Sequence, residues 1–495
     1  MGIVQRQGLR NTVISYAGLG IGFVNTTLIL PRLLLPAQLG LLSVLVALAT
    51  LGSKLAEVGF TNMALRYFPY FRAPESGHRG FLPLLLGVPL AVFIVVLLGM
   101  WLGRPLVLRW YSHGQDTTLV AAHYGVMLGL AFCILIYNLL DAYAKSLFHT
   151  AFSSFLVEVV QRLLVVSSAA LYAAKILSFN GFVLAYLGAY AVVALALLVY
   201  LGGVGELHLA PRREVLAVRP LGELLRFSGW VLLGNISGNI LVTVDSLMLG
   251  SQKGLAEAGI YVIALNISTA LAIPFRALYK TAYPLVAEYW KEGATAKMLD
   301  FYRRSTRLTT AVGAYLALGI ALNLPFIYSL IHRPAYAAGT TAVLLLLLGR
   351  LTDGVTGLNG IIVATSPRYR YDLLFNVGLA GSIILLNYLL IPRLGLTGAA
   401  LSNCLALAGI NLARTWFVWR SFGWQPFDRT VLYLLALASG AALMAWALPD
   451  LNNSWLTLLL RGGVLTVLYG AGLLLTGWVP EVNAIWAGVR KQLGK

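Results

Sequence analysis

Eleven charged residues fall within or beside long apolar stretches of this 495-residue chain, where an uncompensated charge needs a reason. At the centre of a bilayer a charge costs roughly 2.5–3.5 kcal/mol on insertion scales. Such residues are expected to pair with one another, to reach the lipid headgroups or to bind a charged ligand. The six bases and five acids are Lys54, Arg162, Arg276, Arg350, Arg414 and Arg461, with Glu57, Asp141, Glu158, Asp245 and Asp353.

Four of the acids have a basic residue three or four positions away. The pairs are Lys54/Glu57, Arg350/Asp353, Asp141/Lys145 and Glu158/Arg162. Side chains at these spacings share one face of a helix, so each pair can neutralise itself and lower the cost of insertion. The pairs could serve only to neutralise charge in the membrane, or they could belong to a functional site, and the sequence leaves both interpretations open.

The composition decides what kind of protein carries these charges. Hydrophobic residues make up 59% of the chain and charged residues 11%, and the mean hydropathy is +0.81. A soluble domain has about a quarter charged residues, so a water-soluble protein is excluded. A disordered chain is excluded as well, because disordered chains are poor in apolar residues. Continuous apolar runs of about 20 residues span a membrane as helices, whereas a β-barrel needs short alternating strands. The sequence predicts an all-α polytopic membrane protein.

Fourteen membrane-spanning helices are predicted, at 11–31, 39–60, 81–102, 119–143, 152–174, 181–203, 225–249, 256–280, 305–330, 337–365, 371–391, 397–419, 430–448 and 455–478. An even number puts both termini on one side. With these spans, 23 of the 36 lysines and arginines fall on one side and seven on the other. Cytoplasmic loops are rich in Lys and Arg, so both termini are predicted to be cytoplasmic. The net charge of +18 then needs no nucleic-acid partner.

The order of the spans indicates a duplication. Six spans are followed by a basic linker and six more, and a shift of 219 residues brings Leu35–Gly40 into register with Gly254–Gly259. Two similar bundles with a site between them are typical of transporters. We predict two pseudo-symmetric six-helix lobes plus two C-terminal helices, divided as 1–203 for the N-terminal lobe, 204–224 for the linker, 225–419 for the C-terminal lobe and 420–495 for spans 13 and 14 with the tail.

The signatures of catalysis and of metal binding are missing from the sequence. Every loop is too short to fold as a soluble catalytic domain, which typically needs ~100 residues. Cys133 and Cys404 have no CxxC neighbour, the histidines have no HExxH spacing, and no phosphate loop is present. We expect no enzyme, no metal site and no cofactor. A membrane glycosyl polymerase is a weak alternative, because it would carry long outer loops.

Several motifs, in their order and spacing, resemble those of polysaccharide exporters. They are Ile29–Leu34 with Gln38–Gly40, Gly59–Phe60 with Ala64–Phe68, Val244–Gly250 with Ala258–Tyr261, Ile273–Leu278 with Tyr283–Pro284, and Asn387–Gly395 with Thr397–Ala400. Over nearly the whole chain they are similar to the Wzx-type flippases of the multidrug/oligosaccharidyl-lipid/polysaccharide (MOP) exporter superfamily. The resemblance implies a monomeric protein of the bacterial inner membrane that moves a polyprenyl-pyrophosphate-linked oligosaccharide to the outer leaflet by alternating access. Polysaccharide polymerase machinery and membrane lipids would be its partners.

The resemblance also assigns roles to intramembrane charges. Similar flippases hold the substrate's pyrophosphate with basic residues on the second and eighth spans, which gives this role to Lys54 and Arg276. The 219-residue shift places Arg276 on Glu57, one turn from Lys54, so the two bases are expected at similar depth. Glu57, Arg350 and Asp353 are included in the predicted substrate cavity. In the alternative interpretation, Lys54 and Arg276 only extend to the inner headgroups.

A second predicted site would bind a coupling ion in the outer half of the membrane. Asp245 has no helical partner, and Asn387 and Asn403 lie at a similar depth. Carboxylate and amide oxygens bind hard cations, so the three are predicted to hold Na⁺, or Asp245 alone to carry H⁺. Alternatively, Asp245 faces the outer interface and the asparagines pack between helices.

Two relatives within the superfamily are the main functional alternatives. Lipid II flippases carry charges in the first span, whereas this span has Asn11, Ser15, Asn25, Thr26 and Thr27 but no charge, which favours the oligosaccharide branch. A multidrug cation antiporter would need acidic rather than basic groups in its cavity, because its substrates are cations.

Overall fold

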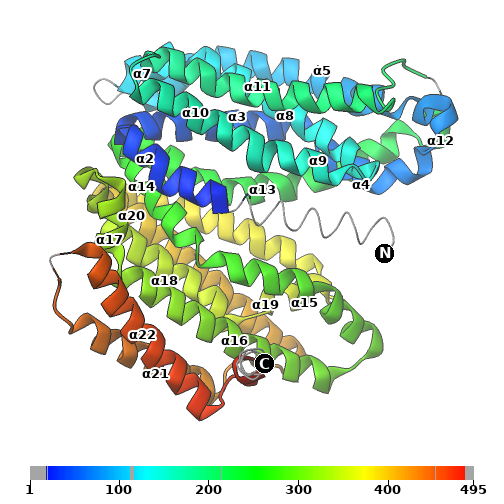
Figure 1. The fold of residues 1–495 in the computed structure, drawn as a ribbon. Coiled ribbons are helices and arrows are strands. Elements are labelled where there is room, and N and C mark those ends of the chain that lie inside the picture. Colours follow the sequence, from blue (N-terminus) through cyan, green and yellow to red (C-terminus); the bar gives the residue numbers. More distant parts are fainter. Residues whose placement is uncertain (1–17, 19, 112–115, 213, 452, 485–495) are drawn as a thin grey trace, which may run out of the picture. The chain divides into compact units, whose positions relative to one another are not determined.

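The computed structural model describes residues 18, 20–111, 116–212, 214–451 and 453–484, nearly all of them in helices (Figure 1). No strand occurs among these residues. Within the described ranges, ten helices are long and apolar enough to cross a membrane, or up to twelve if two bent pairs each form one span. The predicted class, an all-α polytopic membrane protein, is confirmed. The first predicted span lies largely outside the described residues, and the count of fourteen stays a prediction.

Two compact units, Met1–Val262 and Ile263–Lys495, make up the chain. The first unit contains η1 (Asn25–Ile29), α2 (Leu30–Leu33), α3 (Pro36–Glu57), α4 (Phe60–Phe71), η2 (Pro74–Gly80), α5 (Phe81–Leu102), α6 (Arg104–Trp110), α7 (Asp116–Ala122), α8 (Tyr124–Ser146), α9 (Thr150–Phe155), η3 (Leu156–Gln161), α10 (Arg162–Ala173), α11 (Phe179–Gly203), α12 (Glu214–Val218), α13 (Leu221–Lys253) and the start of α14 (Leu255–Thr269). The lobes predicted at 1–203 and 225–419 are a different division of the chain and stay a prediction.

The second unit continues α14 and adds nine further elements. They are α15 (Ala272–Glu292), α16 (Thr295–Leu322), α17 (Leu324–Ile331), η4 (Pro334–Gly339), α18 (Thr340–Thr356), α19 (Asn359–Thr365), α20 (Arg370–Phe422), α21 (Arg429–Trp446) and α22 (Ser454–Thr476). Alanines of α16 and α21 are buried against Leu465 and Tyr469 of α22. Small side chains let helices approach closely where no water drives association, so this alanine-rich face forms one core of the unit.

The 53-residue α20 is folded back on itself rather than continuous. Gly395 has φ 54° and ψ −131°, and a Cβ on Gly398 would lie 2.7 Å from the carbonyl carbon of Leu390. In a straight helix those residues would be about 12 Å apart. Asp372 and Arg414 also form an ion pair at 3.0 Å across 42 positions. The turn predicted between the spans 371–391 and 397–419 is therefore present.

Two glycines of the first unit meet in a reciprocal contact that follows the 219-residue shift. Helices α3 and α14 begin at Pro36 and Leu255, which correspond under that shift. A Cβ on Gly40 would overlap the Leu255 carbonyl, and a Cβ on Gly259 would overlap the Pro36 carbonyl. Each hypothetical Cβ also lies 3.0 Å from the backbone nitrogen of the other glycine. The contact has the symmetry expected of a duplicated helix start.

Substitution of Gly259 tests this close approach. We expect Gly259→Ala to lower the free energy of unfolding by about 1–3 kcal/mol, because the added methyl meets backbone that cannot move aside cheaply. The matched control is Gly99→Ala in α5, where a Cβ meets nothing within 4 Å. There alanine should be neutral or stabilising by up to about 1 kcal/mol, since it is the better helix former. Unfolding of the detergent-purified protein measures both, and equal effects would contradict the contact.

Candidate functional site

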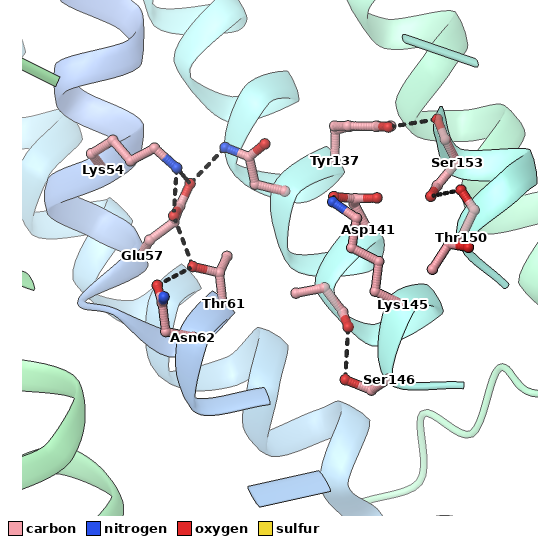
Figure 2. A network of polar contacts seen from close by, with 12 residues as sticks. Lys54, Glu57, Thr61, Asn62, Tyr137, Asp141, Lys145, Ser146, Thr150 and Ser153 are labelled. Atoms are coloured by element: carbon pink, nitrogen blue, oxygen red, sulfur yellow. Dashed lines mark hydrogen bonds and ion pairs between the residues drawn. The ribbon is translucent and has the colours of Figure 1, made fainter. Parts of the chain in front are cut away.

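Glu57 and Lys54 form a buried, saturated polar centre at the end of α3 (Figure 2). The Lys54 Nζ donates to both carboxylate oxygens, at 3.0 and 2.9 Å. Asn138 of α8 donates to Oε1 at 2.6 Å, and Ser53 and Thr61 add contacts at 3.3 and 3.4 Å. The Glu57 side chain is fully buried, whereas 27% of the Lys54 side chain is exposed. The predicted pair is therefore formed, with the carboxylate inside and part of the ammonium accessible.

The centre lies directly beside a break in its span. Val58 has φ 48° and Gly59 has φ 76°, after which α4 begins at Phe60. A positive φ is strained for a β-branched residue such as Val58. A Cβ on Gly59 would overlap the Ser228 carbonyl of α13, so glycine is required there. The break lets Thr61, the second residue of α4, contact the carboxylate of the preceding helix.

The two other predicted pairs of the first unit are also formed. Lys145 and Asp141 of α8 lie 2.5 Å apart (Figure 2). Arg162 and Glu158 lie 2.5 Å apart, and Arg162 also donates to the Gly18 carbonyl. Asn25 of the first predicted span is buried and donates to the Arg162 carbonyl at 3.4 Å.

Of the four other polar residues named in that span, the structure describes two. Thr26 and Thr27 lie in η1, where Thr27 is buried, whereas Asn11 and Ser15 lie outside the described residues.

Arg276 lies exposed near a second helix break, in the second unit. Helices α14 and α15 are bent by 51° between Thr269 and Ala272, and Arg276 follows on the first turns of α15. It has no hydrogen bond or ion pair among the residues that the structure describes. An arginine inside a membrane span is costly to keep without a partner. Because the described residues provide none for Arg276, its guanidinium is available to an anionic group.

Arg350 and Asp353 do not form the ion pair that their spacing predicted. Arg350 instead donates to Ser268 and Thr269 at the end of α14, both at 3.1 Å. Asp353 accepts a 2.5 Å hydrogen bond from Asn411. Each group thus donates to or accepts from another helix, while Arg350 stays close enough to act electrostatically on Asp353. Arg350 thereby holds the end of the helix that leads to Arg276.

The predicted ion ligands are all buried. Asp245 of α13 accepts a 2.6 Å hydrogen bond from Tyr261 of α14 within the first unit. Asn387 and Asn403 of α20 belong to the second unit. An Na⁺ or H⁺ site formed by the three stays a prediction.

Sequence patterns missed several polar residues that the structure brings together. Asn138 reaches Glu57 from 81 positions away, and Asn411 reaches Asp353 from 58 positions away. Arg414 pairs with Asp372 from 42 positions away and donates to the Asn376 oxygen at 2.9 Å. The only signal in the sequence was the presence of amides inside apolar helices, which does not identify their partners.

A double-mutant cycle tests the Lys54–Glu57 centre. Lys54→Met should lower the free energy of unfolding by about 1–3 kcal/mol, because the Glu57 carboxylate would stay buried without its cation. Adding Glu57→Gln should restore much of that loss, since an amide keeps the bond from Asn138 without a buried charge. Additive losses in the double variant, measured by denaturant unfolding in detergent, would contradict the coupling.

The comparisons with known proteins concern both the family and the fold. The lipid II flippase MurJ in an inward closed conformation has a TM-score of 0.75 at 10% identity, over 94% of this chain and 98% of that one. An inward-facing multidrug resistance MATE family transporter of the MOP superfamily has a TM-score of 0.60 at 16% identity, over 85% and 94%. No curated protein sequence matches. At these identities the likeness shows the fold, and it is the fold of transporters and flippases.

The sequence profile of the family described as "Polysaccharide biosynthesis protein" matches residues 6–290, more than half of the chain. The predicted resemblance is confirmed in family and in fold: the chain has the fold of MurJ and the MATE transporter, and it belongs to the polysaccharide biosynthesis protein family.

Proposed function

We propose that this protein is a Wzx-type flippase. It moves a polyprenyl-pyrophosphate-linked oligosaccharide from the cytoplasmic to the outer leaflet of the bacterial inner membrane, for O-antigen, capsule or exopolysaccharide synthesis. Alternating access carries the head group through the protein while the lipid tail stays in the bilayer. The family match and the transporter fold support this proposal, and no chemical step on the substrate is part of it.

The observation that carries the proposal is the exposed guanidinium of Arg276 in an apolar, broken helix. Its insertion cost is offset if a multiply charged anion binds there, and charge-assisted hydrogen bonds to phosphate are among the strongest available. Discontinuous helices are typical of transporter binding sites. The break beside Lys54 repeats the arrangement in the first unit.

Glu57 tunes the second basic group rather than binding the substrate. Its carboxylate holds the Lys54 ammonium in one position and neutralises part of its charge. Lys54 can therefore bind a pyrophosphate and release it again, whereas an unopposed ammonium would hold the anion more tightly. Arg350 contributes indirectly, through the end of α14.

The driving force comes from an ion gradient, the membrane potential or consumption of the product. One elementary charge crossing 100 mV is worth about 2.3 kcal/mol. We propose that the protein acts as a monomer that delivers its substrate to polysaccharide polymerase machinery.

Removal of the Arg276 charge tests the proposed function. In cells that depend on this flippase, Arg276→Ala should abolish export and let lipid-linked oligosaccharide accumulate in the cytoplasmic leaflet, because the pyrophosphate loses its partner. Arg276→Lys should keep part of the export. Lys145→Ala is the control, since it removes an exposed cation that is paired with Asp141. Export is measured as surface polysaccharide, with protein level measured alongside.

Full export by Arg276→Ala at normal protein level would refute the role of this residue. If the protein rescues cells that lack their lipid II flippase and has no effect on surface polysaccharide, the substrate is lipid II and not the proposed oligosaccharide. Efflux of organic cations by the intact protein, with no effect on either lipid, would favour the antiporter.

A further inference from the structure

A polar cavity of about 320 Å³ lies within the second unit, between α15, α18, α19 and both halves of α20. Pockets that hold small ligands measure about 300–1,000 Å³ and are mostly apolar. This cavity is at the lower end of that range, and two tyrosines, two aspartates, three asparagines and one arginine line it. An apolar helical bundle gains nothing from so polar a cavity unless a polar ligand occupies it.

The charges around this cavity compensate one another. Arg414 pairs with Asp372 at 3.0 Å. Asp353 accepts a hydrogen bond from Asn411, and its charge is opposed electrostatically by two bases, Arg350 and Arg414. Two arginines thus stand against two carboxylates. Walls without net charge favour a neutral ligand that donates and accepts hydrogen bonds over an ion.

Several polar groups of these walls keep hydrogen-bonding capacity. The Asn359 nitrogen donates to the Asn411 carbonyl at 3.0 Å and to Thr415 at 3.1 Å, which orients the amide. Its oxygen accepts no hydrogen bond from the residues that the structure describes, and the Tyr283 hydroxyl has none within the same ranges. The buried Nε of Arg414 also lacks an acceptor in the described part of the chain. Donors and acceptors are both available, as the hydroxyl groups of a sugar require.

Helix α15 connects the cavity with Arg276. Tyr279 and Tyr283 follow Arg276 by three and seven positions, so the three side chains share one face of the helix. Tyr279 lies about 5 Å along the helix axis from Arg276. Its hydroxyl donates to the Gly357 carbonyl at 3.3 Å, and both residues line the cavity. A ligand whose pyrophosphate lies at Arg276 can therefore extend along this face into the cavity.

The walls include helix ends that lie beside predicted cytoplasmic loops. Asp372 is at the beginning of the predicted span 371–391, and Arg414 is near the end of the span 397–419. With both termini cytoplasmic, these two ends are on the cytoplasmic side of the membrane. The proposed substrate enters from that leaflet, so its head group arrives on the side where the cavity lies.

We propose that this cavity binds the neutral sugar residue next to the pyrophosphate of the lipid-linked oligosaccharide, an inference that rests on the proposed function. Asp372 and Asn359 accept from the sugar hydroxyls, and the ring of Tyr283 packs against the apolar face of the sugar. An ionised carboxylate has about four acceptor positions, so Asp372 can accept from hydroxyls while it is paired with Arg414. Tyrosine combines an apolar ring with a polar hydroxyl.

Such a cavity lets the protein distinguish the loaded carrier lipid from the empty one. A site that forms hydrogen bonds to hydroxyl groups rejects a ligand that lacks them, because the polar groups of the site are then left unpaired. Arg276 binds the pyrophosphate, which both lipids carry, and the cavity reads the sugar, which only the loaded lipid carries.

Binding of two lipids to the full-length protein in detergent tests the proposal. The probes are the polyprenyl-pyrophosphate-linked oligosaccharide extracted from the cells that make it, and polyprenyl pyrophosphate without sugar. The unmodified protein should bind the first about tenfold more tightly or better, and Tyr283→Ala should lose most of this difference with its affinity for the sugar-free lipid unchanged. Tyr433→Ala is the matched control, since Tyr433 is 45% exposed, against 49% for Tyr283, and does not line the cavity.

A second variant obstructs the cavity without removing a polar group. A Cβ on Gly360 would lie 3.5 Å from Nη1 of Arg414, which is an ordinary contact, so a side chain can be accommodated at this position of the cavity wall. Gly360→Leu should weaken binding of the glycosylated lipid alone. Arg276→Ala should weaken binding of both lipids, because both carry the pyrophosphate.

The two lipids separate failure of this inference from failure of the proposed function. Equal affinity of the unmodified protein for both lipids, or equal losses for both in Tyr283→Ala and Gly360→Leu, would overturn the sugar site and leave the role of Arg276 in place. Binding of neither lipid would overturn the proposed function and this inference with it.

Hydrogen exchange on the unmodified protein gives a readout that needs no variant. The glycosylated lipid should slow exchange of the backbone amides in 357–365, next to the cavity, more than the sugar-free lipid does. Equal slowing by both lipids in this segment, or none by either, would contradict the sugar site.

Discussion

A carboxylate placed inside an apolar bundle must be neutralised, and much of the polar structure of this protein follows from that constraint. Glu57 is neutralised by Lys54 and held by Asn138, Ser53 and Thr61. Because α8 provides one of these donors, the centre fixes α3 against α8. Asp372 is neutralised by Arg414 in the same manner, and that pair joins the two halves of α20. Because each buried charge needs partners from other helices, it requires specific contacts between those helices.

Helix breaks are the second means by which this chain positions its charged groups. Val58 and Gly59 interrupt the span that carries Lys54, and the bend between Thr269 and Ala272 precedes Arg276. A break exposes backbone groups that need partners, and these are available only inside the protein or from a ligand. The side chains beside a break can also point in directions that a continuous helix forbids. A membrane protein that must bind a polar head group therefore gains both donors and freedom of movement at such positions.

Contacts between residues close together in the sequence could be predicted, whereas contacts between residues far apart could not. Lys54/Glu57, Asp141/Lys145 and Glu158/Arg162 are formed because helix geometry alone brings such neighbours together. The same rule failed for Arg350 and Asp353, since Ser268 and Asn411 approach from other helices and offer better geometry. Asn138, Asn359 and Asn411 were not predicted, because an amide in an apolar run does not reveal which helix packs against it. The fold class was predicted correctly because it depends on hydropathy summed over many residues. The candidate site depends instead on a few tertiary contacts.

The contrast between Glu57 and Asp353 separates two uses of a buried acid. Glu57 has a lysine and three further donors, so no capacity is left for a ligand, and in the proposed flippase it acts on the substrate only through Lys54. Asp353 has one amide donor, and its charge is opposed electrostatically by Arg350 and Arg414, which donate their hydrogen bonds to other residues. A lysine in direct contact fixes one arrangement of the neighbouring helices, whereas arginines held by other partners compensate a carboxylate without binding it. Because α18 carries both Asp353 and Arg350, and Arg350 holds the end of α14, the compensation of this carboxylate is physically connected to the helix break that precedes Arg276.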